Sequence, residues 1–459
     1  MIFDEIQKSL SDCVENGWDH ILTGEQYKYD VNDAIDKAGK WNQRKCVLNS
    51  RLMMWFVFAL MLYRSLSQKI VLSNLFREFR WHKSQDSIKA VTPEAACHAR
   101  ERLTSKPIQL FFEAQAAKIC PATSFYDLRV YGIDGSAINV PDTPANREFF
   151  GCQKTAAYPQ MKMTALVETS IRQIVAVRFA KHNVSEKDEA SLLLGNIPEN
   201  SVVILDRGLI GIWFFDKFRQ HKCHFLARIT SSWNPKILKI LGNGDSIVEI
   251  TAEIPKKHRA PGVTANMTMR MRMIKYCVDN GETIRLLTDL MDEEKYPARE
   301  IAALYHERWE CETTFDEVKT HLAPRPTGGQ TLLFRSKKPD CILQEAYTLC
   351  SLHNMVRGLM AEAGRAHNVE PLEISLTETV ELIKSATPFF LQAKTDAERN
   401  KVYVQLLKDI SLCRVRKRIG RSYDRSIKKR RDGYTSRSKD YGEKKTKGVI
   451  ELASVNPPL

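Results

Sequence analysis

The stretch Tyr305-His306-Glu307-Arg308-Trp309-Glu310-Cys311-Glu312, continuing to Lys319, decides how the rest of the chain is interpreted. It contains no Gly or Pro and follows the good helix formers of residues 299–304, so it predicts one continuous helix. At about 100° per residue, four side chains of this helix fall within an arc of roughly 60°: Tyr305, Arg308, Glu312 and Lys319. This stripe of a phenol, two cations and a carboxylate suits a site that holds a metal and a phosphate together. A solvated helix face with an Arg308–Glu312 pair would give the same pattern.

The composition is that of a globular protein with an excess of basic residues. The 459 residues leave room for two to four domains, and 43% of them are hydrophobic and 27% charged. The formal net charge of +14 favours a polyanionic partner. Residues 414–447 hold fifteen Lys and Arg against four Asp and Glu, so most of the excess lies in a basic tail.

The cysteines and the apolar segments bear on the compartment. Eleven cysteines are scattered without a C-x-x-C pair, which indicates neither a disulfide framework nor a zinc site and favours a reducing cytoplasm. The acidic start, Met1 to Glu5, lacks the basic segment of a signal peptide. The most apolar run, Leu52 to Tyr63, is too short to span a bilayer, so no membrane association is expected.

Residues 1–125 are predicted to be a helical N-terminal domain. Thr92-Pro93-Glu94 is typical of a helix start, with Thr as the N-cap and Pro at the first helical position. A small helical domain with scattered cations fits a DNA-binding module of helix-turn-helix type, and it fits a packing or dimerisation domain equally. The candidate helices are Ile2–Asn16, Val47–Ser65, Lys69–Phe79, Pro93–Leu103 and Ile108–Lys118.

From residue 126 the pattern changes to that of a mixed α/β sheet, which we assign as the first part of a catalytic core over 126–230. A strand over 128–134 ends in Asp-Gly, and a hairpin follows over 161–180. The apolar run Ser201–Asp206 is typical of a strand buried on both faces. Helices are predicted at 186–194 and 209–221, and a further strand at 223–229.

The remaining chain is divided into three further parts. Short β-rich runs separated by Gly, Pro and Asn predict a β-rich insertion at 231–295. The core resumes over 296–365. It contains the helix that carries Tyr305 to Lys319, which we call the organising helix, and a long helix at Cys341–Ala363. Residues 366–459 are predicted to be a C-terminal helical region that ends in the basic tail.

Three carboxylates form the candidate catalytic constellation. Asp134 and Asp206 each end a predicted strand, and Glu312 lies on the later helix. Each Asp alone is most often a turn residue, so only the joint pattern is informative. Converging carboxylates repel one another unless cations are present, and all-oxygen ligands favour Mg²⁺ or Mn²⁺. Two such ions would support in-line displacement at phosphorus. No Walker A loop or G-x-G-x-x-G competes with this interpretation.

These motifs resemble those of the bacterial insertion-sequence DDE transposases, in particular the insertion-sequence-four family. Its Y-(2)-R-(3)-E-(6)-K signature is met by Tyr305, Arg308, Glu312 and Lys319. Leu209 departs from the family at a position where an aromatic residue is common. Other blocks similar to the family are Ile133-Asp134-Gly135-Ser136, Pro141-Asp142-Thr143-Pro144, Tyr158-Pro159-Gln160-Met161-Lys162-Met163, Leu205-Asp206-Arg207-Gly208 and Arg335-Ser336-Lys337-Lys338-Pro339.

The resemblance implies a ribonuclease-H-like core with a β-rich insertion and two Mg²⁺ ions, which Mn²⁺ could replace. It implies that Asp134, Asp206 and Glu312 are the catalytic metal ligands. The expected DNA-contact residues are Tyr305, Arg308, Lys319, Arg335, Lys337 and Lys338. The implied reaction is cut-and-paste transposition at terminal inverted repeats, with a hairpin intermediate and strand transfer into target DNA. A homodimer on double-stranded DNA, at the nucleoid, is expected because two ends must be paired.

Two other functions share these residues. A transposase-derived DNA-binding protein could keep the fold without catalysis, and a metal-dependent nuclease could cleave DNA without strand transfer. The intact triad and signature favour the transposase over the inactive relative.

Overall fold

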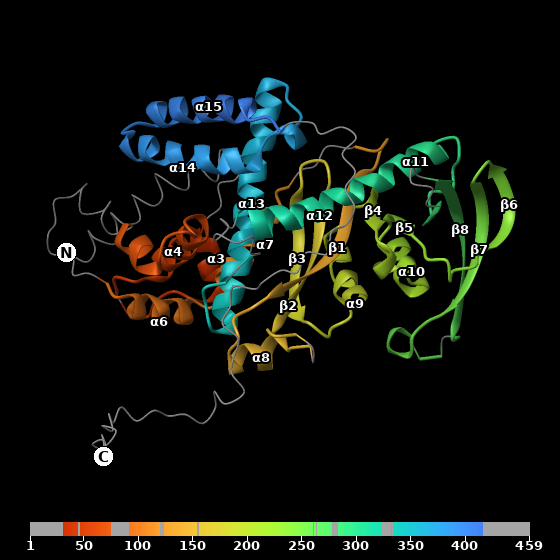
Figure 1. Ribbon diagram of the computed structural model, residues 1–459, viewed down its shortest axis with the longest axis horizontal. Coiled ribbons are helices and arrows are strands. Elements are labelled where there is room, and N and C mark those ends of the chain that lie inside the picture. The colour runs from red at the N-terminus through yellow and green to blue at the C-terminus, as the bar shows by residue number, and fades with distance from the viewer. Residues whose placement is uncertain are drawn as a thin grey trace, which may run out of the picture.

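The computed structural model describes residues 31–44, 46–74, 91–119, 124–153, 156–259, 261–262, 264–277, 283–322, 332 and 334–415. The predicted helix Ile2–Asn16, the end of Lys69–Phe79 and nearly all of the basic tail lie outside these residues. Within them, a mixed nine-stranded sheet runs through the molecule, in the order β3-β2-β1-β4-β5-β9-β8-β7-β6 (Figure 1). This is the α/β architecture that the sequence predicts.

The first five strands form the core of the sheet, and they are β1 (Arg129–Asn139), β2 (Gln160–Glu168), β3 (Gln173–Lys181), β4 (Ser201–Leu205) and β5 (His224–Arg228). The predicted hairpin is confirmed, because β1, β2 and β3 are successive antiparallel neighbours. β4 lies parallel to both β1 and β5 and is buried along its whole length, as its apolar run predicts.

The predicted end of β1 at Asp134 was wrong. The strand continues to Asn139 because β2 pairs with it without interruption, from Tyr131 opposite Glu168 to Asn139 opposite Gln160. Asp134-Gly135 therefore lies inside a strand and forms no turn. The glycine there serves a close approach described below.

The β-rich insertion extends the same sheet. Its strands are β6 (Lys236–Gly242), β7 (Asp245–Glu253), β8 (Asn266–Cys277) and β9 (Thr283–Thr288), all antiparallel to their neighbours. β9 also pairs with β5, so the insertion continues directly from the core strands. β6 was not predicted, because it is exposed along almost its whole length and shows no alternation of buried and exposed residues.

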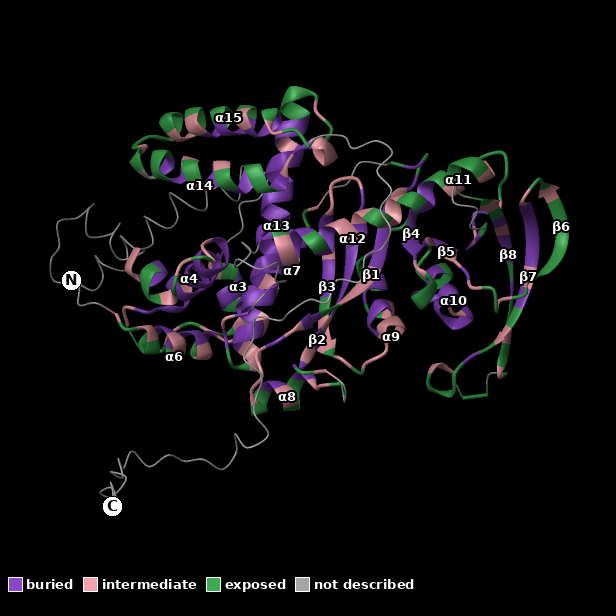
Figure 2. Cartoon of the chain, viewed as in Figure 1, coloured by how far each residue is buried: buried purple, intermediate pink, exposed green. Residues whose placement is uncertain are grey.

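Helices cover both faces of the core strands (Figures 1 and 2). On one face, α9 (Glu186–Ser191) and α10 (Ile212–Gln220) pack with the insertion strands in one hydrophobic cluster. On the other face lies the long, largely buried helix α13 (Pro339–His367), with α8 (Pro144–Phe150) near its start. The C-terminal helices α14 (Leu376–Gln392) and α15 (Asp396–Leu412) pack together and against α13.

Of the four N-terminal helices, the last three pack against α13 and the first packs against two of the others. They are α3 (Val31–Ala38), α4 (Ser50–Leu62), α6 (Pro93–Leu103) and α7 (Lys106–Ala116). α6 has the predicted bounds, and the Thr92 hydroxyl accepts the cap hydrogen bond from the Ala95 amide at 3.3 Å. One hydrophobic cluster extends from Val31 to Ile410, so these helices share a core with the sheet. The domain boundaries drawn from the sequence stay predictions. None of the helices that the structure describes is both long and apolar enough to cross a membrane.

The organising helix was predicted as one continuous α-helix, and this was wrong in detail. The structure has α11 (Ala298–Tyr305), a 3₁₀ turn η6 (His306–Arg308), α12 (Trp309–Asp316) and a π-helical turn η7 (Glu317–His321). These pieces follow one another across the sheet in Figure 1. The hydrogen-bonding pattern therefore departs twice from that of an α-helix along the signature, in η6 and in η7, and both departures alter where side chains point.

Candidate active site

The register of two parallel strands brings Asp134 and Asp206 together. Ile133 of β1 lies opposite Leu205 of β4, which is the last residue of that strand. The residue that follows each of these two is an aspartate, so both carboxylates lie at the same end of the β1–β4 pair. Asp206 then precedes the 3₁₀ turn η4 (Arg207–Leu209). The sequence placed both residues at this edge, and the structure brings them together.

Glu312 reaches this edge because α12 packs very closely on β1. A Cβ added at Gly132 of β1 would lie 2.2 Å from the Sγ atom of Cys311, the residue that precedes Glu312. Only glycine at position 132 allows this separation, since real Cβ contacts are never so short. Gly132 and the buried Cys311 thus set the distance of α12, and of Glu312, from the strand that carries Asp134.

Arg308 joins the two sides of the site. Its Nη1 atom donates to the Glu312 Oε1 atom at 2.8 Å and lies 4.0 Å from the Asp134 Oδ2 atom. The guanidinium is only 13% exposed. Burial alone would lower the pKa of Arg308, but the hydrogen bond to Glu312 and nearby carboxylates raise it. The Arg308–Glu312 pair is therefore not a solvated pair on one helix face. It belongs to a cluster that includes Asp134 of β1.

The charge balance around Asp134 is unfavourable to its ionised form. Burial raises the pKa of the Asp134 carboxyl to about 6, and the charges of Glu186 and Asp206 act in the same direction. The Gly135 amide, which donates to the Asp134 Oδ1 atom at 2.8 Å, and the Arg308 guanidinium oppose this rise. The site holds more negative charge than its own cations compensate.

Glu186, at the start of α9, is a site residue that the sequence analysis missed. An ideal Cβ at Gly135 would lie 2.1 Å from the Glu186 Oε1 atom, so this side chain packs against the backbone beside Asp134. Burial and the Asp206 charge raise the pKa of Glu186, while Lys162 lowers it. A glycine inside a strand often marks such a close approach, and Gly135 was the one signal in the sequence.

Tyr305 is buried near Asp206 and Arg308, with 5% of the residue exposed. Its buried hydroxyl has no hydrogen-bond partner within the described residues. Burial raises the pKa of this phenol and the Asp206 charge raises it further, so the hydroxyl keeps its proton. A buried donor without a partner is rare in native structures and is consistent with a partner that arrives with a ligand.

Lys319 lies in the π-helical turn and still reaches the strand that carries Asp134. Its Nζ atom donates to the Ser136 hydroxyl, two residues from Asp134. The structure thus brings together five of the predicted residues, and Tyr305 is buried next to them. The five are Asp134, Asp206, Arg308, Glu312 and Lys319.

The remaining three predicted DNA-contact residues precede α13, away from this cluster. The Arg335 guanidinium donates to the backbone carbonyls of Leu66, Tyr63 and Arg64, which ties the segment to the end of α4. Lys338 is exposed and pairs with Glu101 at 2.6 Å, and Lys337 is also exposed. Their contact with DNA stays a prediction, and Arg335 already has a structural role.

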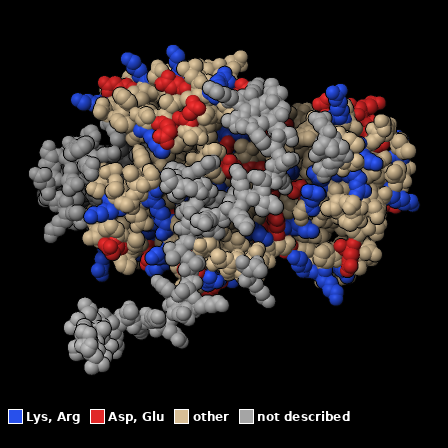
Figure 3. Space-filling model, in the orientation of Figure 1, with Lys and Arg blue, Asp and Glu red and all other residues tan. Residues whose placement is uncertain are grey.

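The donor set fits a hard divalent cation in ligand type. Four carboxylates supply oxygen atoms, and neither His nor a thiolate competes with them. Within the described residues, no three His, Cys, Asp or Glu side chains lie close enough together to hold a metal ion by themselves. The Arg308 guanidinium lies between Asp134 and Glu312 and provides positive charge there. Figure 3 shows acidic side chains in the hollow near the centre of this face.

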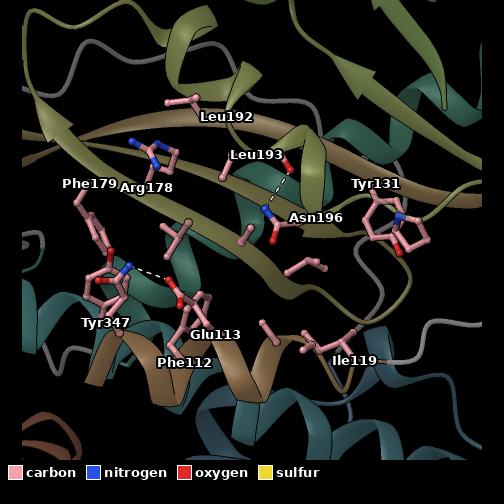
Figure 4. Close-up of a pocket in the computed structure, with 17 residues that line it drawn as sticks. Phe112, Glu113, Ile119, Tyr131, Arg178, Phe179, Leu192, Leu193, Asn196 and Tyr347 are labelled. Carbon is pink, nitrogen blue, oxygen red and sulfur yellow. Dashed lines mark hydrogen bonds between the residues drawn. The ribbon is translucent and has the colours of Figure 1, made fainter. Parts of the chain in front are cut away.

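A separate pocket lies beside β3, the edge strand of the sheet. It has a volume of about 580 Å³ and lies between α7, β3 and the segment after α9 (Figure 4). Phe112, Phe179 and Tyr347 line it together with Arg178 and Glu113. None of the predicted site residues lines this pocket, so it is not part of the candidate active site.

Comparison with known proteins assigns the chain to a family. Residues 126–325 match the family model described as transposase DDE domain, and residues 25–113 match the model of the insertion element 4 transposase N-terminal region. The transposase InsG for insertion sequence element IS4 of Escherichia coli is 24% identical over 77% of this chain and 79% of that protein. The putative transposase InsZ of the same organism is 29% identical over 25% of this chain and 41% of that protein.

A solved structure, that of the piggyBac transposase synaptic complex with hairpin DNA, is similar at a TM-score of 0.44 and 9% identity, over 92% of this chain and 88% of that chain. The two family models match successive parts of the chain. The Y-(2)-R-(3)-E-(6)-K signature lies within residues 126–325, which match the transposase DDE domain. The chain therefore belongs to the insertion-sequence-four family of DDE transposases.

Proposed function

We propose that this transposase performs cut-and-paste transposition with Asp134, Asp206 and Glu312 as its catalytic carboxylates. The observation that carries the proposal is the position of the Arg308 guanidinium, 2.8 Å from Glu312 and 4.0 Å from Asp134. Residues 178 positions apart in the chain thereby share one cation, and Asp206 is adjacent to Asp134 across the strand pair. A merely structural ion pair on α12 would not require two more acidic side chains at the edge of the sheet.

The three carboxylates would hold two Mg²⁺ ions, which Mn²⁺ could replace. Such ions supply the activation of water or of a 3′-hydroxyl and stabilise the leaving oxygen in displacement at phosphorus. The raised pKa of Asp134 supports this role, because a group destabilised as a carboxylate gains most from a cation beside it. Glu186 lies close enough to contribute to the same negative potential.

The neighbouring cations and the phenol would bind the DNA strand. In our proposal Arg308 moves from the carboxylates to a phosphate of the strand being cut, and Lys319 leaves Ser136 to bind the next phosphate. Tyr305 supplies its unpaired hydroxyl as a hydrogen-bond donor from below. Lys337 and Lys338, both exposed before α13, would bind phosphates further along the duplex.

The larger assembly follows from the chemistry of transposition. The enzyme would act on the chromosome in the bacterial cytoplasm, as a homodimer that pairs the two terminal inverted repeats of its element. A freed 3′-hydroxyl would attack the opposite strand to form a hairpin, and after the hairpin is opened the same hydroxyl would attack the target. Each of these steps is a displacement at phosphorus, so one set of carboxylates serves all of them.

The test uses the full-length chain with labelled duplexes that carry the element's own terminal repeats, identified from the DNA flanking the reading frame. Asp134→Asn, Asp206→Asn and Glu312→Gln each keep the side-chain size and should lower Mg²⁺-dependent cleavage by at least about 10³-fold. DNA binding, measured by fluorescence anisotropy, should persist. Glu199→Gln, an exposed glutamate paired with Lys222, is the matched control and should cleave like the wild type.

The products decide between the proposal and its alternatives. Denaturing gels resolve nick, hairpin and double-strand break, and a target plasmid captures strand-transfer products. Wild-type cleavage by any of the three variants would remove that residue from the catalytic set. Cleavage without joined products would identify a nuclease, and binding without cleavage by the wild-type chain would identify an inactive relative.

A further inference from the structure

A buried ionic network lies directly beneath the turn that carries Lys319. Its centre is Glu317, the first residue of η7, whose side chain is 6% exposed. Arg172 donates to the Glu317 Oε1 atom at 3.0 Å, and the Arg357 Nε atom donates to the Oε2 atom at 3.0 Å. His353 lies 2.8 Å from the same Oε2 atom. We call Glu317, Arg172, His353, Arg357 and Glu310 the Glu317 network.

The charges of the Glu317 network balance. Burial alone would raise the pKa of Glu317, but the Arg357 charge and the His353 hydrogen bond hold it well below its ordinary value, so the carboxylate stays ionised. Burial lowers the pKa of His353, so its imidazole is neutral and donates through Nε2. Arg172 also donates to Glu310, which leaves two guanidinium groups facing two carboxylates.

The β2–β3 hairpin and α13 hold the partners of Glu317 in place. Arg172 lies at the tip of the β2–β3 hairpin in a left-handed backbone conformation, with a φ of 56°, and its guanidinium is held by Glu310 and Glu317. The next residues bind α13 directly, since the Asn354 side chain accepts from the Ile174 amide at 2.7 Å and donates to its carbonyl at 2.8 Å. His353 and Arg357 lie on α13 itself, one turn apart. The hairpin and α13 therefore form a fixed frame around Glu317.

The π-helical turn determines the direction in which Lys319 points. The Leu322 amide donates to the Glu317 carbonyl at 2.9 Å, which is the five-residue spacing of a π turn. One residue more per turn rotates the side chains that follow by up to about 100° relative to a continuous α-helix. Lys319 lies two residues after Glu317, within this rotated segment, and there its ammonium reaches the Ser136 hydroxyl of β1.

We propose that the Glu317 network is a positioning device, which holds the π-helical turn in place and thereby sets where the Lys319 ammonium lies relative to Asp134. Glu317 itself does not touch the DNA, because its carboxylate is enclosed by Arg172, His353 and Arg357. Its anchors come from the hairpin and from α13, so the position of Lys319 depends on elements outside the signature helix. The proposal rests on the role given above to Lys319 in binding phosphate.

The first measurement is independent of activity. Limited acylation of the full-length protein, followed by mass spectrometry, gives the reactivity of the Lys319 amine relative to that of the exposed Lys337. Ser136→Ala removes the hydroxyl that accepts from Lys319 and calibrates the signal of an amine without that hydrogen bond. Glu317→Gln should raise Lys319 reactivity several-fold, toward the Ser136→Ala value. The matched control is Asp245→Asn, which breaks an equally buried pair with Arg272 (2.6 Å) in the insertion and should leave Lys319 unchanged.

A milder variant keeps the test decisive if Glu317→Gln does not fold. His353→Phe preserves bulk and total charge and removes one hydrogen bond to Glu317, so it should raise Lys319 reactivity by a smaller factor. Unchanged Lys319 reactivity in the folded variants would overturn the proposal. So would an equal rise in Asp245→Asn, since that would reflect a general loss of stability.

The second measurement is a double-mutant cycle on DNA cleavage. If Glu317 acts through Lys319, Glu317→Gln should slow cleavage about tenfold and should add no further loss to Lys319→Ala. Multiplicative losses would overturn the link between the two residues. If Lys319→Ala cleaves like the wild type, the phosphate-binding role of Lys319 is wrong. If Lys319 reactivity nevertheless rises in Glu317→Gln, the positioning role of the network is still supported.

Discussion

Two ionic clusters lie on the same helical segment and differ in how their charges are compensated. In the active site, four carboxylates (Asp134, Asp206, Glu186 and Glu312) outnumber the nearby cations Arg308, Lys162 and Lys319, and burial together with like charges raises the pKa of Asp134 to about 6. In the Glu317 network, two arginines face two carboxylates, and the pKa of Glu317 is lowered. Glu312 of the active site and Glu317 of the network are only five residues apart in the chain.

The difference teaches how to separate function from architecture in buried charge. A balanced cluster satisfies itself and holds its surroundings in one arrangement. An unbalanced cluster costs stability in the free protein and persists because a ligand completes it. The predictions below test this distinction through stability, in metal-free buffer and without DNA, from the largest expected effect to the smallest.

Breaking the balanced cluster should have the largest effect. Glu317→Gln leaves Arg357 and Arg172 buried without a full counter-charge, and we expect a loss of about 3–5 kcal/mol in the free energy of unfolding at pH 7. Because the folded-state pKa of Glu317 is lowered, its contribution is present above the ordinary glutamate pKa and is lost as the pH falls below it. Urea unfolding of both proteins from pH 7 down to about pH 2 measures this. An equally stable variant would mean that the cluster is not a structural anchor.

Neutralising the unbalanced cluster should have the opposite sign. Asp134→Asn should stabilise the protein at pH 7, by at most about 3 kcal/mol for a pKa raised from 3.8 to about 6. A raised pKa means that the folded state binds the proton more tightly, so the wild type loses this stability as the pH rises from about 4 to 6. The two proteins should converge near pH 4. Destabilisation by Asp134→Asn at pH 7 would contradict the view that the site is strained by its own charge.

The fit of α12 on β1 should have an intermediate effect. Gly132→Ala places a methyl 2.2 Å from the Cys311 Sγ atom, and we expect a loss of about 1–3 kcal/mol from overpacking, together with slower cleavage as Glu312 moves outward. Cys311→Ala removes that sulfur, and the Cβ at 311 would lie 3.9 Å away, so the double variant should recover much of both losses. A double variant no better than Gly132→Ala would show that other contacts set the position of the helix.

An exposed pair sets the lower end of the scale. Glu199→Gln removes the partner of Lys222 at 2.9 Å, where both side chains are more than half exposed. Its effect on unfolding should be below about 1 kcal/mol and should vanish in high salt. Thermal unfolding at low and high ionic strength is sufficient to measure it. A larger effect would mean that exposure is a poor guide to the value of an ion pair here.

Much of the sheet could be predicted from sequence because its strands bury alternating or continuous apolar residues. The run before Asp206 and the hairpin after Met161 illustrate this, and both are confirmed. β6 could not be predicted in this way because neither of its faces is buried. The continuation of β1 past Asp134 depends on its pairing with β2, which is a long-range interaction that a local Asp-Gly signal cannot report.

The candidate site was predictable in its residue types and less so in its geometry. Asp134 and Asp206 meet because β1 and β4 are parallel and in register, a pairing that the sequence analysis did not specify. Glu186 was missed because its approach depends on the space above Gly135. The changes to 3₁₀ and π geometry within the signature helix were also missed, since the partners that hold Glu317 come from residues 172, 353 and 357.

The pairing of β9 with β5 has a consequence for how such an enzyme can evolve. Without the insertion, β5 would be an uncovered edge strand, and an apolar edge invites intermolecular pairing and aggregation. A lineage that lost the insertion would therefore lose solubility before any change in its DNA specificity could be selected. If relatives keep the insertion strands, the reason can be that β9 covers the edge of β5. Keeping the insertion is therefore not by itself a sign that it binds DNA.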